Sequence, residues 1–433
     1  MRCLRCWIWL SVFAFLLMAC GNSDSSEEGN QLSLAPTNTP PPEATATATP
    51  SPEPSPTPTP EPTPTPDYIA NPPPRPTTPA QTVPETGRTY PPGMYEYIHT
   101  QFDVPHPPAP VPDEFVQSLP APPDGVCPLT GVPVDDPAVL QRRPLNVRID
   151  NSPQGRPQSG LAFADVVWET LAEGGITRFT ATFLCQTPEV IGPVRSARLI
   201  DLQLWPMLDA ILVHVGASQP VTDMILSSPW NRANIDEWLG HNAFYRIPAD
   251  QAAVSWLRTY TSAARLWQFA ESIGEQRPSR TLRGWQFDAT PPDGGRPART
   301  VIIPYSPGTS SVVTYRYDAE SGRYLRYQGD TPHIDRTTGT QLSAATIFIV
   351  FADMTVTPIV EDSLGNKSLH FKVWGEGKGI VVRDGRAYDV TWRREGENVL
   401  IRPIAPDGSI FPFKPGPLWV QIVPTGMDVS LSE

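Results

Sequence analysis

Arginine and carboxylate residues are concentrated in one stretch of this chain, where together they could bind an anion or a metal ion. The set consists of Asp150, Arg156, Glu169, Glu173, Arg178, Arg195, Arg198 and Asp201. Arg195 and Arg198 follow Gly192-Pro193 and lie near the start of a helix expected over residues 194–204. Free backbone N–H groups at a helix start favour an anion, and guanidinium groups add paired hydrogen bonds to phosphate or carboxylate. The spacing therefore predicts an anion-binding site around these two arginines.

Two other uses of the same residues remain open. Asp150, Glu169 or Glu173 could hold a divalent cation through oxygen ligands. The arginines and carboxylates could also pair with one another and only hold loops in place, because structural ion-pair networks often imitate functional sites. We expect no resident metal ion or cofactor, and Mg²⁺ enters only if the chain is an enzyme.

The histidines and glycines give weaker signals. His214 lies in the apolar run AILVHV, so a buried, hydrogen-bonded core position is the economical interpretation. His333 and Asp335 share a short loop and are expected to stabilise a turn, since no Ser or Cys in a nucleophile-elbow context accompanies them. Residues 375–379 (GEGKG) lack phosphate-loop spacing and are expected to form a glycine-rich β turn. The sequence thus identifies no catalytic residue.

The hydrophobic pattern predicts the elements that carry the charged set. Residues 145–150 alternate as a strand, and the β-prone runs 164–171 and 176–184 flank a short Gly-rich turn, as in a hairpin. Residues 210–215 form an apolar run typical of a strand buried on both faces, and helical patterns follow it. We therefore expect an N-terminal α/β domain with a mixed sheet over residues 126–290.

The pattern changes after a Pro- and Gly-rich break at residues 291–297. Short alternating runs follow, divided by turns such as Asp384-Gly385, which is typical of a β hairpin. A C-terminal β-rich domain is expected over residues 297–426. The predicted fold class is α/β plus mainly β, preceded by a disordered Pro-rich linker.

The first 20 residues have the pattern of a lipoprotein signal peptide. Arg2 and Arg5 precede a short apolar stretch that ends at Ala19-Cys20. Such signals are cleaved before the cysteine, whose thiol then carries a diacylglycerol, and two or more acyl chains give stable anchoring. The prediction is a signal peptide over residues 1–19, lipidation at Cys20, and attachment to the extracytoplasmic side of the cell membrane. A plain secretory signal with an incidental cysteine is the alternative.

Composition indicates a tether after this anchor. The chain has 55 prolines among 433 residues, and most of them precede residue 125. Thr-Pro, Ser-Pro and Glu-Pro pairs recur there and large apolar residues are few, so we expect a disordered linker over residues 20–125.

Charge and cysteine content limit the partners. The net charge of -12 and the lack of a basic stripe argue against a nucleic-acid partner. Cys127 and Cys185 remain in the exported part, where they could form one disulfide or stay as two separately buried thiols. Two cysteines and scattered histidines do not give the ligand spacing of a zinc site.

Several stretches resemble the YerB-like lipoprotein family. In the N-terminal domain they are RPLNVRIDN (143–151), RPQSGLAFADVV (156–167), EGGITRF (173–179) and IGPVRSAR (191–198). In the C-terminal domain the similar pattern is Tyr317-Asp318, Gly322, Tyr324, Arg326, His333, Asp335, Gly375 to Gly379, Thr391-Trp392 and Pro415-Gly416 to Trp419. The resemblance covers about residues 127–424 and implies a two-domain, lipid-anchored protein. It implies no activity, because the role of that family is not established.

Three functions agree with these patterns. The favoured one is a membrane-anchored binding or accessory protein of the cell envelope, whose arginine cleft holds an anionic envelope component. The second is an enzyme acting on lipid-linked envelope precursors, since the order of strand, arginine-bearing Gly/Pro loop and helix is distantly similar to the LytR-CpsA-Psr phosphotransferases. The third is a structural scaffold without a ligand site. The expected partners are membrane lipid at the anchor and an anionic envelope component.

Overall fold

The computed structural model describes residues 66–306 and 311–433. The predicted signal peptide, the lipidation site Cys20 and the linker up to residue 65 lie outside the described residues. All described residues belong to one compact unit, Pro64–Glu433. Within the two described ranges, none of the helices combines the length and the apolar character that crossing a bilayer requires.

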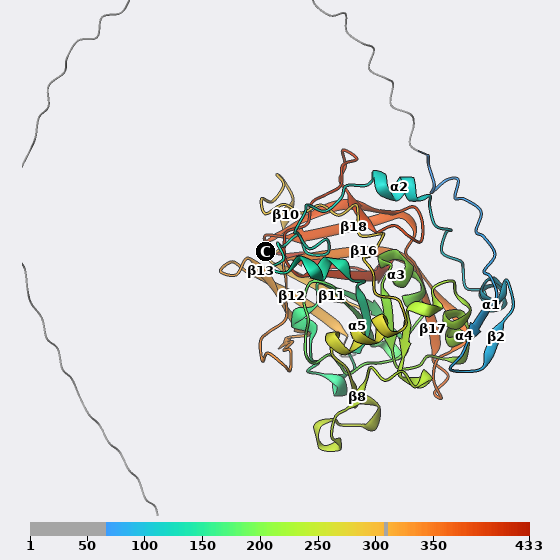
Figure 1. Ribbon diagram of the computed structural model, residues 1–433. Helices are drawn as coiled ribbons and strands as arrows, with labels where there is room; N and C mark the ends of the chain where they lie inside the picture. The colour runs from blue at the N-terminus through green and yellow to red at the C-terminus, as the bar shows by residue number, and fades with distance from the viewer. Residues whose placement is uncertain (1–65, 307–310) are drawn as a thin grey trace, which may run out of the picture. The chain divides into compact units, whose positions relative to one another are not determined.

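A twelve-stranded sheet runs through both halves of the chain (Figure 1). Its strands in spatial order are β10 (Arg296–Pro297), β19 (Arg386–Arg394), β18 (Gly375–Arg383), β16 (Thr346–Val360), β21 (Leu418–Pro424), β4 (Val166–Leu171), β5 (Thr177–Phe183), β3 (Leu145–Asp150), β6 (Ile211–His214) and β7 (Asn234–Asp236), with β17 (Lys367–Lys372) on β16 and β20 (Arg402–Ile404) on β19. Strand β21 pairs in parallel with β16 on one side and with β4 on the other. The two halves therefore share one sheet, and β21 is the strand that joins them.

The N-terminal half has the expected mixed sheet. Strands β4 and β5 form the predicted hairpin and β5 pairs antiparallel with β3, whereas β6 is parallel to β3 and β7 to β6. Both faces of these strands are buried, as their apolar runs predict. Helix α3 (Asp201–Leu208) packs on one face of the sheet and α5 (Ala263–Ser272) packs on the other. Helix α4 (Gln219–Ser227) packs in a separate hydrophobic cluster with residues of α3. The prediction of an α/β domain is confirmed.

The C-terminal half adds a second, antiparallel sheet. Its strands in spatial order are β14 (Thr331–Pro332), β13 (Arg323–Gln328), β12 (Val312–Asp318), β11 (Thr300–Pro304) and β22 (Ser430–Ser432), with β15 (Ser343–Ala344) on β13. The predicted Asp384-Gly385 turn joins β18 to β19, and both residues have the positive φ that this kind of hairpin turn requires. The prediction of a β-rich domain is confirmed.

Residues 375–379 form the first half of β18, so the expected glycine-rich turn is wrong. Gly377 lies opposite Trp392 on β19, and a Cβ at Gly377 would come within 2.7 Å of the Trp392 indole nitrogen. The glycine thus makes room for a buried tryptophan inside a strand.

Residues 66–125 are folded against the rest of the chain, so the predicted linker does not extend to residue 125. They form a hairpin of β1 (Gln81–Val83) and β2 (Arg88–Tyr90), followed by α1 (Met94–Gln101) and α2 (Asp113–Ser118). A few large side chains, among them Tyr95 and Ile98 of α1, bury their surface against α3 and α4. Proline content misled the prediction: prolines restrict the unfolded backbone, so few anchors are enough to dock such a segment.

Acid is expected to destabilise this chain through His99 of α1. Burial of this ring, together with the charge of the neighbouring His106, lowers the pKa of His99 from 6.5 to about 3. Below pH 6.5 the unfolded chain binds a proton at His99 that the folded chain does not bind. The contribution of the neutral His99 to the free energy of unfolding is therefore complete above pH 6.5 and is lost as the pH falls toward 3. At pH 4.5 the loss from His99 alone is about 2–3 kcal/mol.

Urea unfolding of the wild type and of His99→Gln at pH 7 and pH 4.5 measures this effect. The difference between the two proteins isolates His99 from the carboxylates, in particular from Asp165, whose raised pKa changes stability in the opposite direction. The same pH dependence in both proteins would contradict the assignment.

Candidate functional site

The structure gathers the predicted charged residues into one network that extends across both halves. Six arginines face five carboxylates in it: Arg148, Arg156, Arg178, Arg195, Arg198 and Arg326 with Asp150, Glu169, Glu173, Asp201 and Glu361. Asp150 ends β3 and lies directly opposite Arg178 of β5. The antiparallel register of the sheet therefore brings residues from separate predicted stretches together.

Glu173 is the centre of one part of the network. Arg198 donates a hydrogen bond of 2.7 Å to Glu173, and Arg178 lies 3.7 Å from the same carboxylate. Burial by itself would raise the pKa of Glu173, but the hydrogen bond from Arg198 and the charges of both arginines outweigh it and lower that pKa to about 2. Glu361, which directly follows β16, adds a second carboxylate 3.5 Å from Arg198. The chain's own carboxylates thus already neutralise Arg178 and Arg198.

Arg195 and Arg198 do not lie in the first turn of a helix, so this part of the prediction is wrong. Helix α3 begins at Asp201, and the Asp201 carboxylate accepts a hydrogen bond from the backbone N–H of Arg198. Arg195 instead lies in extended backbone beside β3, where its N–H bonds the carbonyl of Arg148. An acidic side chain of the protein therefore occupies the place expected for an external anion at the helix start.

Asp150 and Asp201 form ion pairs with the remaining arginines of this half. The Arg195 guanidinium lies 3.6 Å from Asp150, and the Arg148 guanidinium lies 3.1 Å from Asp201. Arg148 is fully buried, and burial lowers its pKa despite the opposing charge of Asp201. The sequence analysis did not include Arg148 among the site residues, although its polar place in the strand pattern of residues 145–150 was a usable signal.

Glu169 pairs with a residue of the other half. Both of its oxygens accept hydrogen bonds of 3.0 Å from Arg326 of β13, and both side chains are 0% exposed. His333 contacts Arg326, and its other ring nitrogen lies 2.7 Å from the amide oxygen of Gln158. Arg326 was part of the family resemblance but not of the predicted site. Its alternation with tyrosine and leucine in β13 was the only sequence signal of burial.

A cavity of about 460 Å³ opens beside this pair, where residues of both halves meet. Its walls combine the apolar residues Pro157, Val312, Pro332 and Ile334 with Arg156, Gln328, Thr331 and His333. Arg156 donates a hydrogen bond to the carbonyl of Asn151, and burial followed by the charge of Arg326 lowers its pKa to about 10. Arg156, one of the predicted arginines, thus lines this cavity.

His214 and Asp335 have structural contacts. His214 is buried and bonds the Gly216 carbonyl and Asn234, which confirms the core interpretation. Asp335 accepts hydrogen bonds from the backbone N–H groups of Thr337 and Ala162, so it stabilises its turn without the predicted help of His333.

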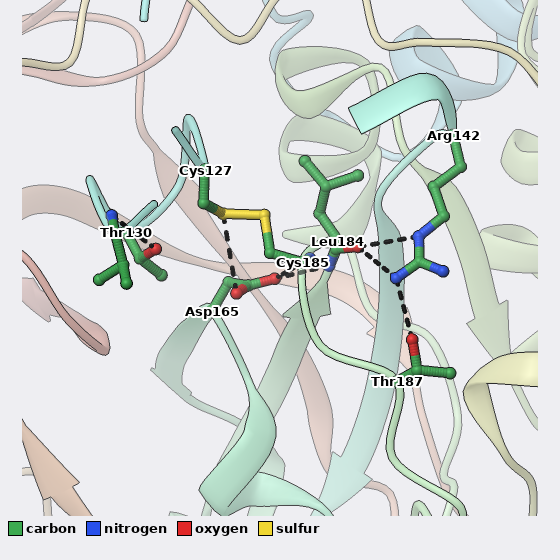
Figure 2. Close-up of a disulfide and its surroundings, with 8 residues drawn as sticks. Cys127, Thr130, Arg142, Asp165, Leu184, Cys185 and Thr187 are labelled. Carbon is green, nitrogen blue, oxygen red and sulfur yellow. Dashed lines mark hydrogen bonds between the residues drawn. A yellow bond between two sulfur atoms is a disulfide. The ribbon is translucent and has the colours of Figure 1, made fainter. Parts of the chain in front are cut away.

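Cys127 and Cys185 form a disulfide, with 6.1 Å between their Cα atoms (Figure 2). The bond connects the loop before β3 to the segment just after β5. Asp165 lies beside it: its carboxylate and the two sulfur atoms are within 4.8 Å of one another. Because the sulfur atoms are joined, this group is a disulfide with a neighbouring carboxylate. Asp165 was not among the predicted site residues.

An α/β half and a β-rich half that share one sheet define a class of two-part fold, and both parts match family models. Residues 129–276 match the N-terminal domain, and residues 301–420 the C-terminal domain, of a protein of unknown function (DUF3048). The chain is 33% identical over 311 residues to "Putative lipoprotein YerB" of Bacillus subtilis (strain 168), a match that covers 71% of this chain and 88% of that protein. The chain belongs to this DUF3048 family.

A solved structure agrees with the assignment. The crystal structure of the YerB protein from Bacillus subtilis matches with a TM-score of 0.60 and 32% identity, over 71% of this chain and 99% of that chain. The predicted resemblance to the YerB-like lipoproteins is therefore confirmed.

Proposed function

We propose that this chain is a lipid-anchored binding protein of the extracytoplasmic membrane surface, and that the cavity lined by Arg156 is its ligand site. The proposed anchor is Cys20, supported by the signal pattern around it and by a relative that is named as a lipoprotein. Pro-rich sequence after Cys20 separates the anchor from the described head. The ligand would then meet the cavity at the outer side of the membrane.

The position of Arg156 in the cavity wall is the observation that supports this proposal. Arg178, Arg195, Arg198 and Arg326 each form an ion pair with a carboxylate of the chain, and Arg156 lines the cavity beside Arg326 and His333. A guanidinium group in a cavity wall can bind a phosphate or carboxylate of a ligand through charge-assisted hydrogen bonds.

The cavity walls define the rest of the ligand. Four of its residues are apolar, and they lie beside the arginine. An amphiphile with one phosphate or carboxylate head and an apolar body fits this combination, because each part meets a surface of its own kind. Binding is sufficient for this function: burial and the charge of Arg326 hold the pKa of His333 well below its usual range, and both ring nitrogens face a protein partner.

Isothermal titration of residues 20–433 with geranyl phosphate and with geraniol tests the proposal. We expect saturable binding of geranyl phosphate and none of geraniol, since only the phosphate supplies an anionic group for the Arg156 guanidinium. Arg156→Gln should weaken binding about 10- to 100-fold, the usual effect of losing a charge-assisted hydrogen bond.

Arg393→Gln is the matched control, because Arg393 lies on the exposed part of β19 and pairs with Glu376 away from this cavity. It should bind geranyl phosphate like the wild type. No saturable binding to the wild type, or equal binding to Arg156→Gln, would exclude the cavity as the site.

A further inference from the structure

We propose that the Cys127–Cys185 bond is an exchange-active disulfide, in which Cys185 is the sulfur attacked by an external thiolate and Asp165 exchanges the proton of Cys127. This activity is separate from ligand binding at Arg156. Three features of the described structure support it: the access to Cys185, the carboxylate behind Cys127, and the hydrogen bonds that fix this carboxylate.

The two cysteines differ in exposure. A cavity of about 210 Å³ reaches the disulfide and is lined by both cysteines. Cys127 is 1% exposed, whereas Cys185, just after β5, is only partly buried. We therefore assign the more exposed Cys185 as the sulfur that an entering thiolate attacks, and Cys127 as the leaving sulfur.

The carboxylate of Asp165 lies on the buried side of the bond. One oxygen of Asp165 is 3.9 Å from the Cys127 sulfur. The other oxygen accepts hydrogen bonds of 2.6 and 2.8 Å from the N–H groups of Leu184 and Cys185, which fix its orientation (Figure 2). A buried acid in contact with a buried sulfur is the arrangement needed to move a proton to or from a thiol that water does not reach.

The acidity of Asp165 suits this task. Burial raises its pKa to about 6, although the hydrogen bonds from Cys185 and Leu184 and the charge of Arg142 act in the opposite direction. Arg142 lies outside contact with the sulfur atoms and donates to the Leu184 carbonyl and to Thr187. Near neutral pH the acid and its conjugate base are then both accessible.

The exchange balances with a dithiol as reductant. One thiolate of the dithiol bonds the Cys185 sulfur, the Cys127–Cys185 bond breaks, and its electron pair leaves on Cys127, which takes the proton of the Asp165 acid. The second thiol of the dithiol loses its proton to water and, as a thiolate, attacks the mixed disulfide and releases Cys185 as a thiolate, which is protonated from solvent. The dithiol is oxidised to a disulfide and the cysteine pair is reduced by two electrons. In the reverse direction the Asp165 carboxylate accepts the proton of Cys127.

Stopped-flow reoxidation of the full chain in detergent tests the role of Asp165. The chain is reduced with dithiothreitol under native conditions and reoxidised with glutathione disulfide between pH 5 and 8. We expect Asp165→Asn, which keeps an oxygen for the two N–H donors, to slow the closing step at least about tenfold and to remove the inflection near the acid's pKa. Asp136→Asn is the control, since Asp136 lines the same cavity but caps the turn at Ala138. An unchanged rate profile in Asp165→Asn would overturn the proposal.

A second measurement does not depend on the folding of that variant. Cys127→Ala leaves the accessible thiol and Cys185→Ala leaves the buried one, and each is treated with 5,5′-dithiobis(2-nitrobenzoate). We expect Cys185 to react at least about tenfold faster than Cys127. Equal rates, or a wild-type disulfide that dithiothreitol reduces only at the rate of global unfolding, would show a purely structural bond.

Discussion

Glu169→Gln is expected to lower the free energy of unfolding by about 3–5 kcal/mol, although the substitution changes a single oxygen to an amide group. Glu169 and Arg326 are both fully buried, and each oxygen of the carboxylate accepts a hydrogen bond from the guanidinium. Glutamine keeps the volume but leaves the buried Arg326 charge uncompensated. Urea unfolding at pH 7 measures the loss.

The surface of the same molecule provides a matched control. Glu376 and Arg393 form an ion pair of 2.8 Å, with side chains 48% and 43% exposed. Glu376→Gln should cost no more than about 1 kcal/mol, because solvent screens the pair. Combining Glu169→Gln with Arg326→Gln should cost less than the sum of the single changes, since the double variant buries no lone charge. A cost below about 1 kcal/mol for Glu169→Gln alone would contradict the buried pair.

Removing the disulfide by Cys127→Ala together with Cys185→Ala is expected to destabilise the chain by about 4 kcal/mol. The two cysteines are 58 residues apart in sequence, and a loop of that length gives this value when the loss of entropy in the unfolded chain is the main term. Urea unfolding of the double variant against the oxidised wild type measures it.

Dithiothreitol provides the internal check. The reduced wild type should unfold at the urea concentration of the double variant, and the double variant should not respond to the reagent. A difference below about 1 kcal/mol between oxidised and reduced wild type would show that the segment before β3 is held by packing alone.

The position of Glu169 explains why both halves matter to the proposed site. Strand β21 of the C-terminal half lies next to β4, and Gln421 is the register partner of Glu169. Tyr305, also from the C-terminal half, donates a hydrogen bond to the Glu169 carbonyl. The wall of the cavity at Arg156 and the ion pair beneath it are therefore built only when the shared sheet forms.

Local features of this chain followed from its sequence. The strand over residues 145–150, the hairpin of β4 and β5, and the Asp384-Gly385 turn depend on alternation and on residues that accept positive φ, and these signals act over a few residues. The division into an α/β half and a β-rich half, and the resemblance to the YerB-like lipoproteins, rest on the same kind of local pattern.

Tertiary structure alone decided which charges meet. Glu169 pairs with Arg326, which is 157 residues away in the sequence. Asp165 lies beside the disulfide because the start of β4 and the end of β5 are paired in the sheet. The ordering of residues 66–125 likewise depends on a few anchors such as Tyr95, which bury their surface on distant helices. Burial and ion pairing stabilise contacts between residues far apart in the chain, and the spacing of residues along the sequence does not indicate which of those contacts form.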